Sequence, residues 1–481
     1  MVRDHQKPLQ HINLDRDFNI ATDLLQLISS EQAYHYHIVP QDKGNGSVTF
    51  KTDRVSEDLK QELEIVLGIR VELTAVPTED IKRYLSANFR KRENTRSESL
   101  HYSSDFLEKL IHTAKDIGSS DIHFEPYENK CRVRYRLDGK LKEQFVVSLE
   151  EYPVIVNKLK IRAGLDISEK RLPQDGRISI KTELNEFDIR VSSLPTLHGE
   201  KLVLRILNKD ADRINLEDLG FTGRELRLYR ECVKKPNGIV LISGPTGSGK
   251  TTTLYATLKL LNDERTNILT IEDPIEYTLE GINQVQLKEN IGLDFASTLR
   301  TFLRQDPDVI MVGEIRDAKT ANMAIRAALT GHLVLSTIHT NSAWATISRL
   351  IDMGIPAFLI ASTLNVSVAQ RLVRKLCNDC KREEPIESGL FPDGFTPPRD
   401  LKTHFVAKGC HACYQTGYRG RKAIYEIIPI TRPLTERIKH NDLEIDDYLN
   451  DKKIATLKGN ALEMVRGGTT SLDEVYALLS D

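Results

Sequence analysis

The octapeptide GPTGSGKT at residues 244–251 constrains the fold of this chain more than any other feature. It matches the pattern G-x-x-x-x-G-K-[ST], follows an apolar run that predicts a strand at residues 239–242, and leads into the helical stretch TTLYATLKLL. The glycines let backbone N–H groups turn toward phosphates, and the following helix points its positive end at the same anion. The pattern therefore predicts a phosphate-binding loop; a glycine-rich turn without a ligand is the alternative.

In a loop of this kind the lysine, here Lys250, reaches the β- and γ-phosphates of a nucleotide. The hydroxyl of Thr251 is then placed to ligate Mg²⁺. We therefore expect ATP and Mg²⁺ to bind at this loop. The predicted nucleotide-binding residues are Gly244, Pro245, Thr246, Gly247, Ser248, Gly249, Lys250, Thr251 and Thr252.

From about residue 218 onward, short apolar runs alternate with stretches of helical character. The runs read GIVLIS, NILTIE, DVIMVGE and HLVLSTIH, which is the pattern of strands covered by helices on both faces. We expect an α/β domain with a largely parallel sheet. Ligand sites in such sheets lie at the carboxyl ends of the strands, so the residues that follow each run are the candidates for chemistry.

Titratable side chains follow three of these predicted strands. Glu272 and Glu314 each end an apolar run, and His339 follows a third run whose other end carries His332. Carboxylates beside a phosphate loop suit two tasks, which are holding the water shell of Mg²⁺ and activating the attacking water. Helix capping is the alternative, and it is a fair one for Asp317 but a poor one for the two glutamates. A glycine precedes Glu314 where most such enzymes carry an aspartate, so the motif leaves open which glutamate is the base.

The rest of the chain divides into further domains, because 481 residues exceed a single core. Residues 90–99, RKRENTRSES, contain no apolar side chain and predict a solvated linker. They separate a first domain at 1–89 from a second at 100–208. The second domain is predicted to be α+β, since two alternating runs flank the hairpin signal Asp138-Gly139. The third predicted domain covers residues 218–481.

Charge and hydropathy restrict the possible partners. The net charge of −2 argues against broad nucleic-acid binding, which normally needs a basic surface. No apolar run reaches the ~18 residues of a membrane-spanning helix, and the N-terminal residues lack the apolar core of a signal peptide. We expect a cytoplasmic protein that meets a membrane only through a partner or a surface patch.

Four of the six cysteines form two C-x-x-C pairs. In a reducing compartment this spacing favours a metal over disulfides, and two such pairs suit a tetrahedral zinc site that staples a module too small to bury a core. Two unrelated buried pairs or a redox couple are the alternatives. Cys131 and Cys232 are most simply structural. The predicted zinc ligands are Cys377, Cys380, Cys410 and Cys413.

Together these motifs resemble the secretion ATPase superfamily, in the branch that contains type II secretion ATPases (general secretion pathway protein E) and type IV pilus assembly ATPases. The phosphate loop is followed in order by an aspartate box, ILTIEDPIEY, a Walker B segment, RQDPDVIMVGEIRD, and a histidine box, TGHLVLSTIHTNSA. Upstream, SSDIHFEP, RYRLDG, EKRLPQDGRI and DIRVSSLPTLHGEKLVLRIL match the family's second N-terminal domain. The resemblance covers roughly residues 100–481.

The resemblance implies a RecA-like P-loop ATPase domain, preceded by a PAS-like α+β domain and a small N-terminal domain, with a zinc module inserted at 377–413. It also implies a ring hexamer with nucleotide at the subunit boundaries. Glu272 would activate water, Glu314 would act on Mg²⁺ or water, and two histidines would sense the γ-phosphate, namely His332 and His339. Arg190 and Arg205 would complete the site across a subunit boundary as arginine fingers, although by themselves they read as surface charge.

The resemblance further implies that residues 1–89 dock onto the cytoplasmic domain of an inner-membrane component, and that the motor works with an inner-membrane platform protein. The implied function is ATP hydrolysis that drives pseudopilus assembly and protein export by type II secretion, at the cytoplasmic face of the inner membrane. Type IV pilus assembly is the alternative, because it shares every motif. An ATP-binding scaffold and a DNA-translocating relative are the alternatives from other classes.

Overall fold

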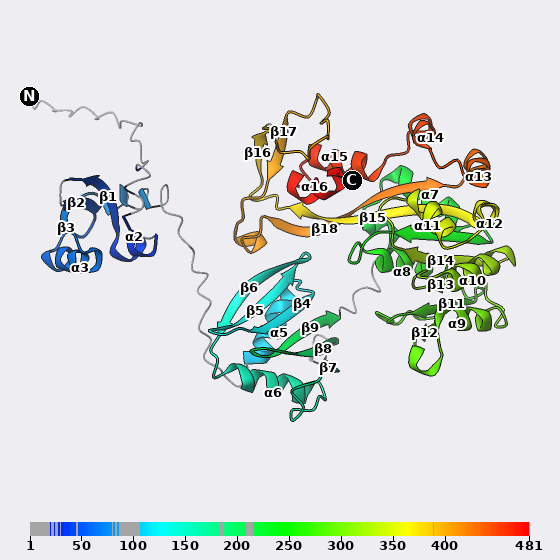
Figure 1. The fold of residues 1–481 in the computed structure, drawn as a ribbon, viewed down its shortest axis with the longest axis horizontal. Coiled ribbons are helices and arrows are strands. Elements are labelled where there is room, and N and C mark those ends of the chain that lie inside the picture. The colour runs from blue at the N-terminus through cyan, green and yellow to red at the C-terminus, as the bar shows by residue number, and fades with distance from the viewer. Residues whose placement is uncertain are drawn as a thin grey trace, which may run out of the picture. The chain divides into compact units, whose positions relative to one another are not determined.

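The computed structural model describes residues 20, 24, 27–28, 30–44, 47–78, 80–81, 84–85, 106–181, 186–207, 215–387 and 389–480 (Figure 1). The predicted linker at 90–99 lies outside these residues. The chain divides into two compact units. The first holds Met1–Ser103 with the short segments Tyr127–Val133 and Glu143–Tyr152, and the second holds the remaining residues.

The N-terminal part contains a small sheet in the order β1-β2-β3, in which β1 and β2 are antiparallel and β2 and β3 are parallel. Side chains of β2 alternate between buried and half-buried, as expected for a strand with one covered face. Helix α3 begins where the Ser56 hydroxyl accepts the Leu59 N–H, and it ends at Gly68 with φ 66°. The elements are α2 (Ser30–Tyr36), β1 (Ile38–Lys43), β2 (Ser47–Thr52), α3 (Glu57–Leu67) and β3 (Arg70–Ala75).

The next domain is built on a sheet in the order β6-β5-β4-β9-β8-β7. Positive φ angles at Asp138 (47°) and Gly139 (90°) form the turn between β5 and β6, at the predicted hairpin. Strands β8 and β9 are antiparallel and place Arg190 directly opposite Arg205. The elements are α5 (Phe106–Asp116), β4 (Asp121–Pro126), β5 (Cys131–Leu137), β6 (Lys140–Val147), α6 (Tyr152–Arg162), β7 (Gln174–Lys181), β8 (Glu186–Thr196) and β9 (Gly199–Leu207).

The largest sheet has the order β12-β11-β13-β14-β10-β15-β18, and its neighbouring strands are parallel except for the last pair, β15 and β18. Alternate side chains of β10 enter different cores: Ile239 and Leu241 join one, and Val240 and Ile242 join the other. Both faces are therefore covered, as the continuous apolar runs predicted. The strands are β10 (Gly238–Ser243), β11 (Ile268–Glu272), β12 (Asn283–Gln286), β13 (Val309–Val312), β14 (Leu333–Ile338), β15 (Leu364–Leu376) and β18 (Tyr418–Pro429).

Helices and short 3₁₀ turns connect and cover these strands. Capping fixes several of them; in α10, for example, the Asp317 side chain accepts the Thr320 N–H, so the capping alternative for Asp317 is confirmed. The elements are η2 (Leu216–Leu219), α7 (Gly223–Val233), α8 (Lys250–Leu261), η3 (Glu289–Ile291), α9 (Phe295–Phe302), α10 (Ala318–Leu329), α11 (Ala345–Asp352), α12 (Ala357–Thr363), α13 (Arg432–Lys439), α14 (Asp446–Lys452), α15 (Leu457–Arg466) and α16 (Leu472–Ser480).

Strands β15 and β18 are long antiparallel neighbours that run side by side in Figure 1. The chain between them forms the cysteine module, with the strand pair β16 (Arg382–Pro385) and β17 (Thr403–Val406) and the turn η4 (His411–Cys413). Leu376, at the end of β15, is paired with Tyr418, at the start of β18. The module therefore leaves and rejoins the sheet at adjacent points.

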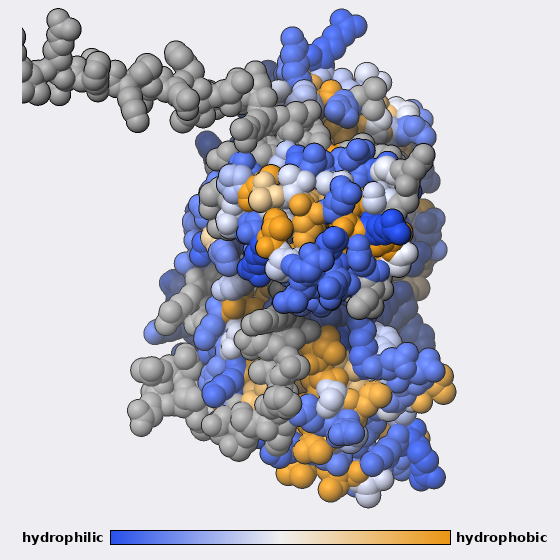
Figure 2. Space-filling view, turned by 90° about the vertical axis from the view of Figure 1, so that its left-hand side faces the viewer, coloured by the Kyte–Doolittle hydropathy of each residue, from blue (hydrophilic) through white to orange (hydrophobic). Residues whose placement is uncertain are grey.

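Hydrophobic side chains remain on an otherwise largely hydrophilic surface, as the face drawn in Figure 2 shows. Several belong to the domain of β4–β9, including Ile161, Leu172, Leu194 and Leu197, the last of which is 92% exposed at the turn between β8 and β9. Among the described residues, every helix is too short or too polar to cross a bilayer.

Candidate functional site

The phosphate loop lies between the end of β10 at Ser243 and the start of α8 at Lys250. Gly244, Gly247 and Gly249 have φ angles of 147°, 81° and 87°, which side-chain-bearing residues rarely adopt. These conformations turn the backbone around the N-terminus of α8, whose positive end faces the loop. The loop therefore has the geometry of an anion cradle at the carboxyl edge of the parallel sheet.

Strand β15 supports this loop from behind through Gln370, whose side chain is only 2% exposed. Its Nε2 donates to the Ser248 carbonyl at 2.8 Å, and its Oε1 accepts from the Thr253 hydroxyl at 2.9 Å. The backbone of Gln370 also packs tightly against the phosphate loop, because a Cβ added to Gly244 would lie only 2.4 Å from the Gln370 carbonyl oxygen. No local sequence pattern marks Gln370 as part of the site, since it lies far along the chain from the loop that it supports.

Lys250 points back into the mouth of the loop. Its Nζ donates to the carbonyls of Gly244 at 2.8 Å and Pro245 at 3.0 Å. Burial lowers the pKa of Lys250; the nearby Glu314 carboxylate opposes this shift, and Arg371 adds to it. Phosphate oxygens would be better acceptors than these carbonyls, because they pair a negative charge with the ammonium group.

Glu314 follows β13 and lies at the open side of the site, with its side chain 17% exposed. The His339 Nε2 atom, at the end of the neighbouring β14, is 3.3 Å from its carboxylate, and Arg316 forms an ion pair with it. No local sequence pattern marks Arg316 as a partner of Glu314. Glu314, His339 and the charge of Lys250 thus come together at one edge of the sheet, as expected for the ends of parallel strands.

Glu272 is in a different environment, because it is 3% exposed and accepts hydrogen bonds from three neighbouring side chains. The Thr270 hydroxyl donates to Oε1 at 2.6 Å, and Gln284 Nε2 donates to the same oxygen at 3.0 Å. The Tyr255 hydroxyl donates to Oε2. A carboxylate accepts about four hydrogen bonds, so these three donors leave about one position for a water molecule.

His332 lies away from these residues. It precedes β14, and its backbone carbonyl accepts the N–H of Gly238, the first residue of β10. Its Nδ1 lies 2.8 Å from the Ala327 carbonyl and 3.1 Å from the Thr330 hydroxyl. The phosphate loop follows the other end of β10, so His332 lies at the opposite end of the strands from the loop of its own chain, and its role in sensing the γ-phosphate stays a prediction. The motif placed both histidines on one strand, but a strand separates its two ends.

Arg190 reaches the aspartate box of its own chain. Its Nη2 donates to the Ile275 carbonyl at 2.7 Å, and its Nη1 lies 3.6 Å from the Glu276 carboxylate. Arg205 pairs instead with Asp121, with Nε 3.0 Å from a carboxylate oxygen, and its side chain is 60% exposed. In this single chain Arg190 thus contacts its own aspartate box, and its expected role across a subunit boundary stays a prediction.

The four predicted zinc ligands come together, and their sulfur atoms all lie within 4.8 Å of one another. Sulfur pairs are 3.8 Å apart for Cys377 and Cys410, 3.9 Å for Cys380 and Cys413, and 3.7 Å for Cys410 and Cys413. A tetrahedron with Zn–S bonds of about 2.3 Å has edges of about 3.8 Å, so these three distances match those of a zinc site.

Cys413 is held toward its thiolate form, whereas burial raises the pKa of Cys377 and that of Cys380. The N–H groups of Cys410 and Gly417 point at the Cys413 sulfur, at 3.1 and 3.2 Å. Burial raises the pKa of Cys413, but these donors outweigh it and lower the value to about 7. His411 lies between the last two cysteines and is not a member of the group that could hold a metal.

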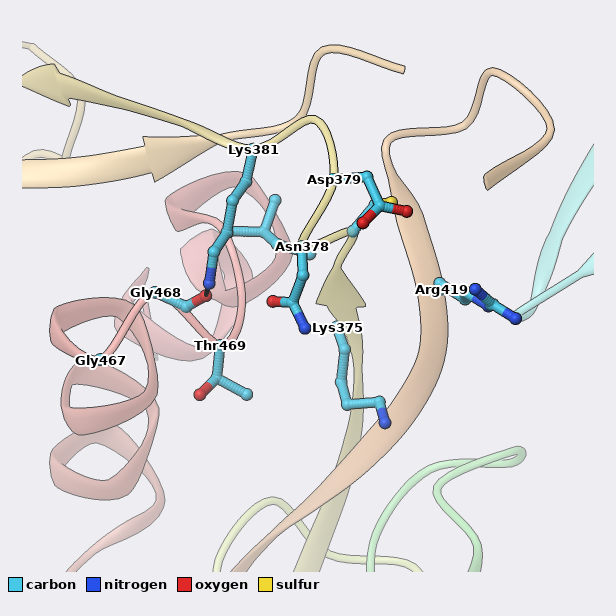
Figure 3. Close-up of a pocket in the computed structure, with 10 residues that line it drawn as sticks. Lys375, Asn378, Asp379, Lys381, Arg419, Gly467, Gly468 and Thr469 are labelled. Atoms are coloured by element: carbon cyan, nitrogen blue, oxygen red, sulfur yellow. Dashed lines mark hydrogen bonds between the residues drawn. The ribbon is translucent and has the colours of Figure 1, made fainter. Parts of the chain in front are cut away.

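A pocket of about 440 Å³ opens beside the first cysteine pair (Figure 3). Lys375, Lys381 and Arg419 give its wall a basic character, with Asp379 as the opposing charge. Lys381 Nζ donates to the Gly468 carbonyl at 2.9 Å, as the dashed line in Figure 3 shows. The wall of the pocket thus ties the cysteine module to the loop that follows α15.

Comparisons with known proteins agree on one family. The family described as "Type II/IV secretion system protein" matches residues 97–477. The type IV pilus assembly ATPase PilB of Myxococcus xanthus (strain DK1622) is 40% identical over 96% of this chain and 88% of its own length. The type II secretion system protein E of Pseudomonas aeruginosa is 49% identical over 74% of this chain and 72% of its own.

Solved structures support the same fold. The pilus retraction motor PilT with bound ADP matches with a TM-score of 0.52 and 26% identity, over 78% of this chain and 96% of that one. The Legionella pneumophila ATPase DotB matches with a TM-score of 0.59 at 21% identity, over 79% of this chain and 96% of that one. The second likeness concerns the fold alone.

Proposed function

The chain belongs to the type II/IV secretion system protein family, and on that premise we propose that it is a hexameric motor ATPase that drives pseudopilus assembly and protein export by type II secretion. One observation carries the proposal: a phosphate loop with Lys250 lies at the same sheet edge as Glu314 and His339. Phosphoryl transfer depends on positioning and on offsetting negative charge, and this edge offers the residues for both.

ATP would bind with its phosphates in the loop of residues 244–252. Lys250 would exchange the carbonyls of Gly244 and Pro245 for the β- and γ-phosphates. Thr251 and Glu314 would hold Mg²⁺, which offsets phosphate charge when bound. His339, paired with Glu314, would respond to the γ-phosphate.

Glu272 is the carboxylate that we assign to water activation. Its three donors fix its orientation and leave about one acceptor position free, which is what an oriented base requires. Because Glu272 is buried, bulk water has little access to it, and an attacking water would enter with the substrate. Glu314, which is more exposed, is better suited to the water shell of the metal.

Arg190 would approach the phosphates from the second domain of the same chain. It contacts the backbone and carboxylate of the loop that follows Glu272, so a small movement of that loop moves the arginine with it. Arg205, directly opposite on β9, would be the second arginine. Arginine fingers in other NTPases contribute about 10³–10⁵ in rate, and their release after hydrolysis would move one domain relative to the other.

The proposed domains keep the predicted bounds: 1–89 for docking, 90–99 as linker, 100–208 for the arginines and 218–481 for catalysis. The exposed Ile161, Leu172 and Leu197 in the second domain are candidate contacts between subunits of the hexamer. We propose that residues 1–89 dock onto the cytoplasmic domain of an inner-membrane component, that a platform protein in that membrane is the second partner, and that nucleic acid is not one. The motor would then work at the cytoplasmic face of the inner membrane.

The tetracysteine cluster would hold one Zn²⁺, with Cys377, Cys380, Cys410 and Cys413 as its ligands. Zinc would act structurally here, because four sulfur ligands leave no open coordination position. Its contribution is to hold together a module that has little apolar core of its own.

Type IV pilus assembly remains the second candidate function, because a relative with that name covers nearly the whole chain. Deletion of the gene separates the two functions: loss of exported enzymes with intact surface pili supports type II secretion. Loss of pili with normal export supports pilus assembly.

The catalytic assignment is tested with Lys250→Ala. We expect phosphate release to fall by about 10²–10³-fold, as for the loss of one donor to the transition state, while circular dichroism and the melting temperature stay close to those of the parent. Turnover at the parent rate would refute the assignment of the site and would favour a scaffold that only binds ATP.

A further inference from the structure

Tyr255 lies at the centre of a buried hydrogen-bond network that joins the phosphate loop to the aspartate box. It sits on α8, the helix that begins at Lys250, and it is 1% exposed. Its hydroxyl donates to Glu272, and the same oxygen accepts the Glu276 N–H at 3.4 Å. One side chain thus contacts the carboxylate that we assign to water activation and the loop that Arg190 reaches.

The surroundings hold this tyrosine in a single orientation. Its ring makes an edge-to-face contact with Tyr277, with centroids 4.6 Å apart at 73°. Gln284 donates to Glu272 and to the Tyr277 carbonyl, at 3.0 and 3.1 Å, so it closes the network from β12. Burial and the adjacent Glu272 raise the pKa of Tyr255, so the hydroxyl keeps its proton at physiological pH.

We propose that Tyr255 is a positioning residue for ATP hydrolysis, which holds the Glu272 carboxylate in orientation and couples it to the loop that receives Arg190. This inference rests on the proposed function of Glu272. Burial of a carboxylate to this extent is unfavourable unless donors surround it. Of the three side chains that donate to Glu272 in the described part of the chain, Tyr255 is the one that comes from α8, the helix that follows the phosphate loop.

The coupling arises because the Tyr255 hydroxyl both donates to Glu272 and accepts the Glu276 N–H. Glu276 carries both the N–H that Tyr255 accepts and the carboxylate near Arg190. A displacement of this loop by the arginine would therefore reach the Glu272 carboxylate through Tyr255. Equally, a shift of α8 on phosphate binding would reach the loop through the same atom.

The test is Tyr255→Phe, which removes one hydroxyl and keeps the ring. We expect kcat to fall by about tenfold to a hundredfold with KM for ATP little changed, since the ground-state contacts of Lys250 are retained. The acid limb of the kcat–pH profile should move to higher pH, because the carboxylate loses one of the donors that favour its charged form. A merely structural role would lower stability without moving that limb.

Tyr229→Phe is the matched control. Tyr229 is also fully buried, and its hydroxyl lies 2.8 Å from that of Thr257 on the same helix α8, so the control removes a comparable hydrogen bond outside the network. We expect it to lower the melting temperature and to leave the pH profile unchanged. If both variants shift the profile equally, the proposal is overturned. If Tyr255→Phe does not fold, Gln284→Met removes another donor to Glu272 and should move the same limb.

A double-mutant cycle separates this inference from the proposed function. In a Glu272→Gln background, Tyr255→Phe should reduce kcat by less than about twofold further, because its effect acts through the carboxylate. Full additivity would overturn the positioning role and leave Glu272 as the base. Parent activity in Glu272→Gln alone, with Lys250→Ala still inactive, would overturn the assignment of Glu272 while the phosphate loop stands.

Discussion

Gly244→Ala is the sharpest probe of the phosphate loop, because the space beside this glycine is occupied by backbone. An added Cβ would lie 2.4 Å from the Gln370 carbonyl oxygen and 2.8 Å from the Ser248 hydroxyl. The first atom belongs to Gln370 of β15, which is paired with Tyr425 of β18 and directly follows Ala369, the last residue paired with β10, so the strand holds it in place. The loop itself must therefore shift.

The size of that shift can be worked out from the contact. Ordinary van der Waals contact for a Cβ begins at 3.4 Å, so the loop must retreat about 1 Å from its place. The φ of 147° adds strain, since alanine rarely adopts it. A displacement of about 1 Å at a reacting group lowers catalysis by about 10²-fold, and we expect a loss of that size in kcat/KM for ATP.

Gly247→Ala is the matched control in the same loop. It also has a positive φ, 81°, but nothing lies within 4 Å of its Cβ position. We expect it to reduce stability by about 1–2 kcal/mol through backbone strain alone, with a much smaller loss of activity. Phosphate release and equilibrium ATP binding measure the first effect, and thermal unfolding measures the second. Equal activity losses in the two variants would refute the reasoning, because they would show that contact with β15 is irrelevant.

Two further predictions concern the metal cluster and the arginine. Cys410→Ser should lower the zinc content from about one per chain and unfold the module locally while the ATPase sheet persists; metal analysis with limited proteolysis checks this, and fresh, reduced parent protein without zinc would contradict it. Chains carrying Arg190→Ala and Lys250→Ala, each inactive alone, should stay inactive after mixing, because Arg190 reaches its own chain. Recovery of ATPase activity in mixtures shown to co-assemble would instead place Arg190 across a subunit boundary.

The ATPase sheet could be predicted from sequence because its strands are short apolar runs with both faces buried. The runs around Ile239, Ile310 and Val334 carry this pattern, and each is a strand of the largest sheet. The carboxyl-end rule then located Glu314 and His339 at one edge, where the His339 Nε2 atom lies 3.3 Å from the Glu314 carboxylate. Motif spacing alone brought the four cysteines together.

Other parts of the site depend on contacts that leave no local pattern. Tyr255 and Gln370 read as ordinary residues of a helix and a strand, and only the fold shows that their polar atoms face Glu272 and Ser248. His332 shows the converse case, because the histidine motif groups two residues that lie at opposite ends of strand β14. The contacts of Arg190 depend on how the second domain meets the ATPase domain. The pattern of apolar residues within either domain does not encode that arrangement.

Because Leu376 is paired with Tyr418, the cysteine module begins and ends at neighbouring residues of two paired strands at the edge of the sheet. A segment whose two ends are already held together can change length with only a slowly growing entropic penalty. β15 and β18 stay paired along their length whatever lies beyond that point, so the sheet that holds the phosphate loop does not depend on the module. Evolution could thus lengthen, replace or remove the cysteine module as a unit. A protein engineer has the same freedom to insert a reporter or a binding domain there.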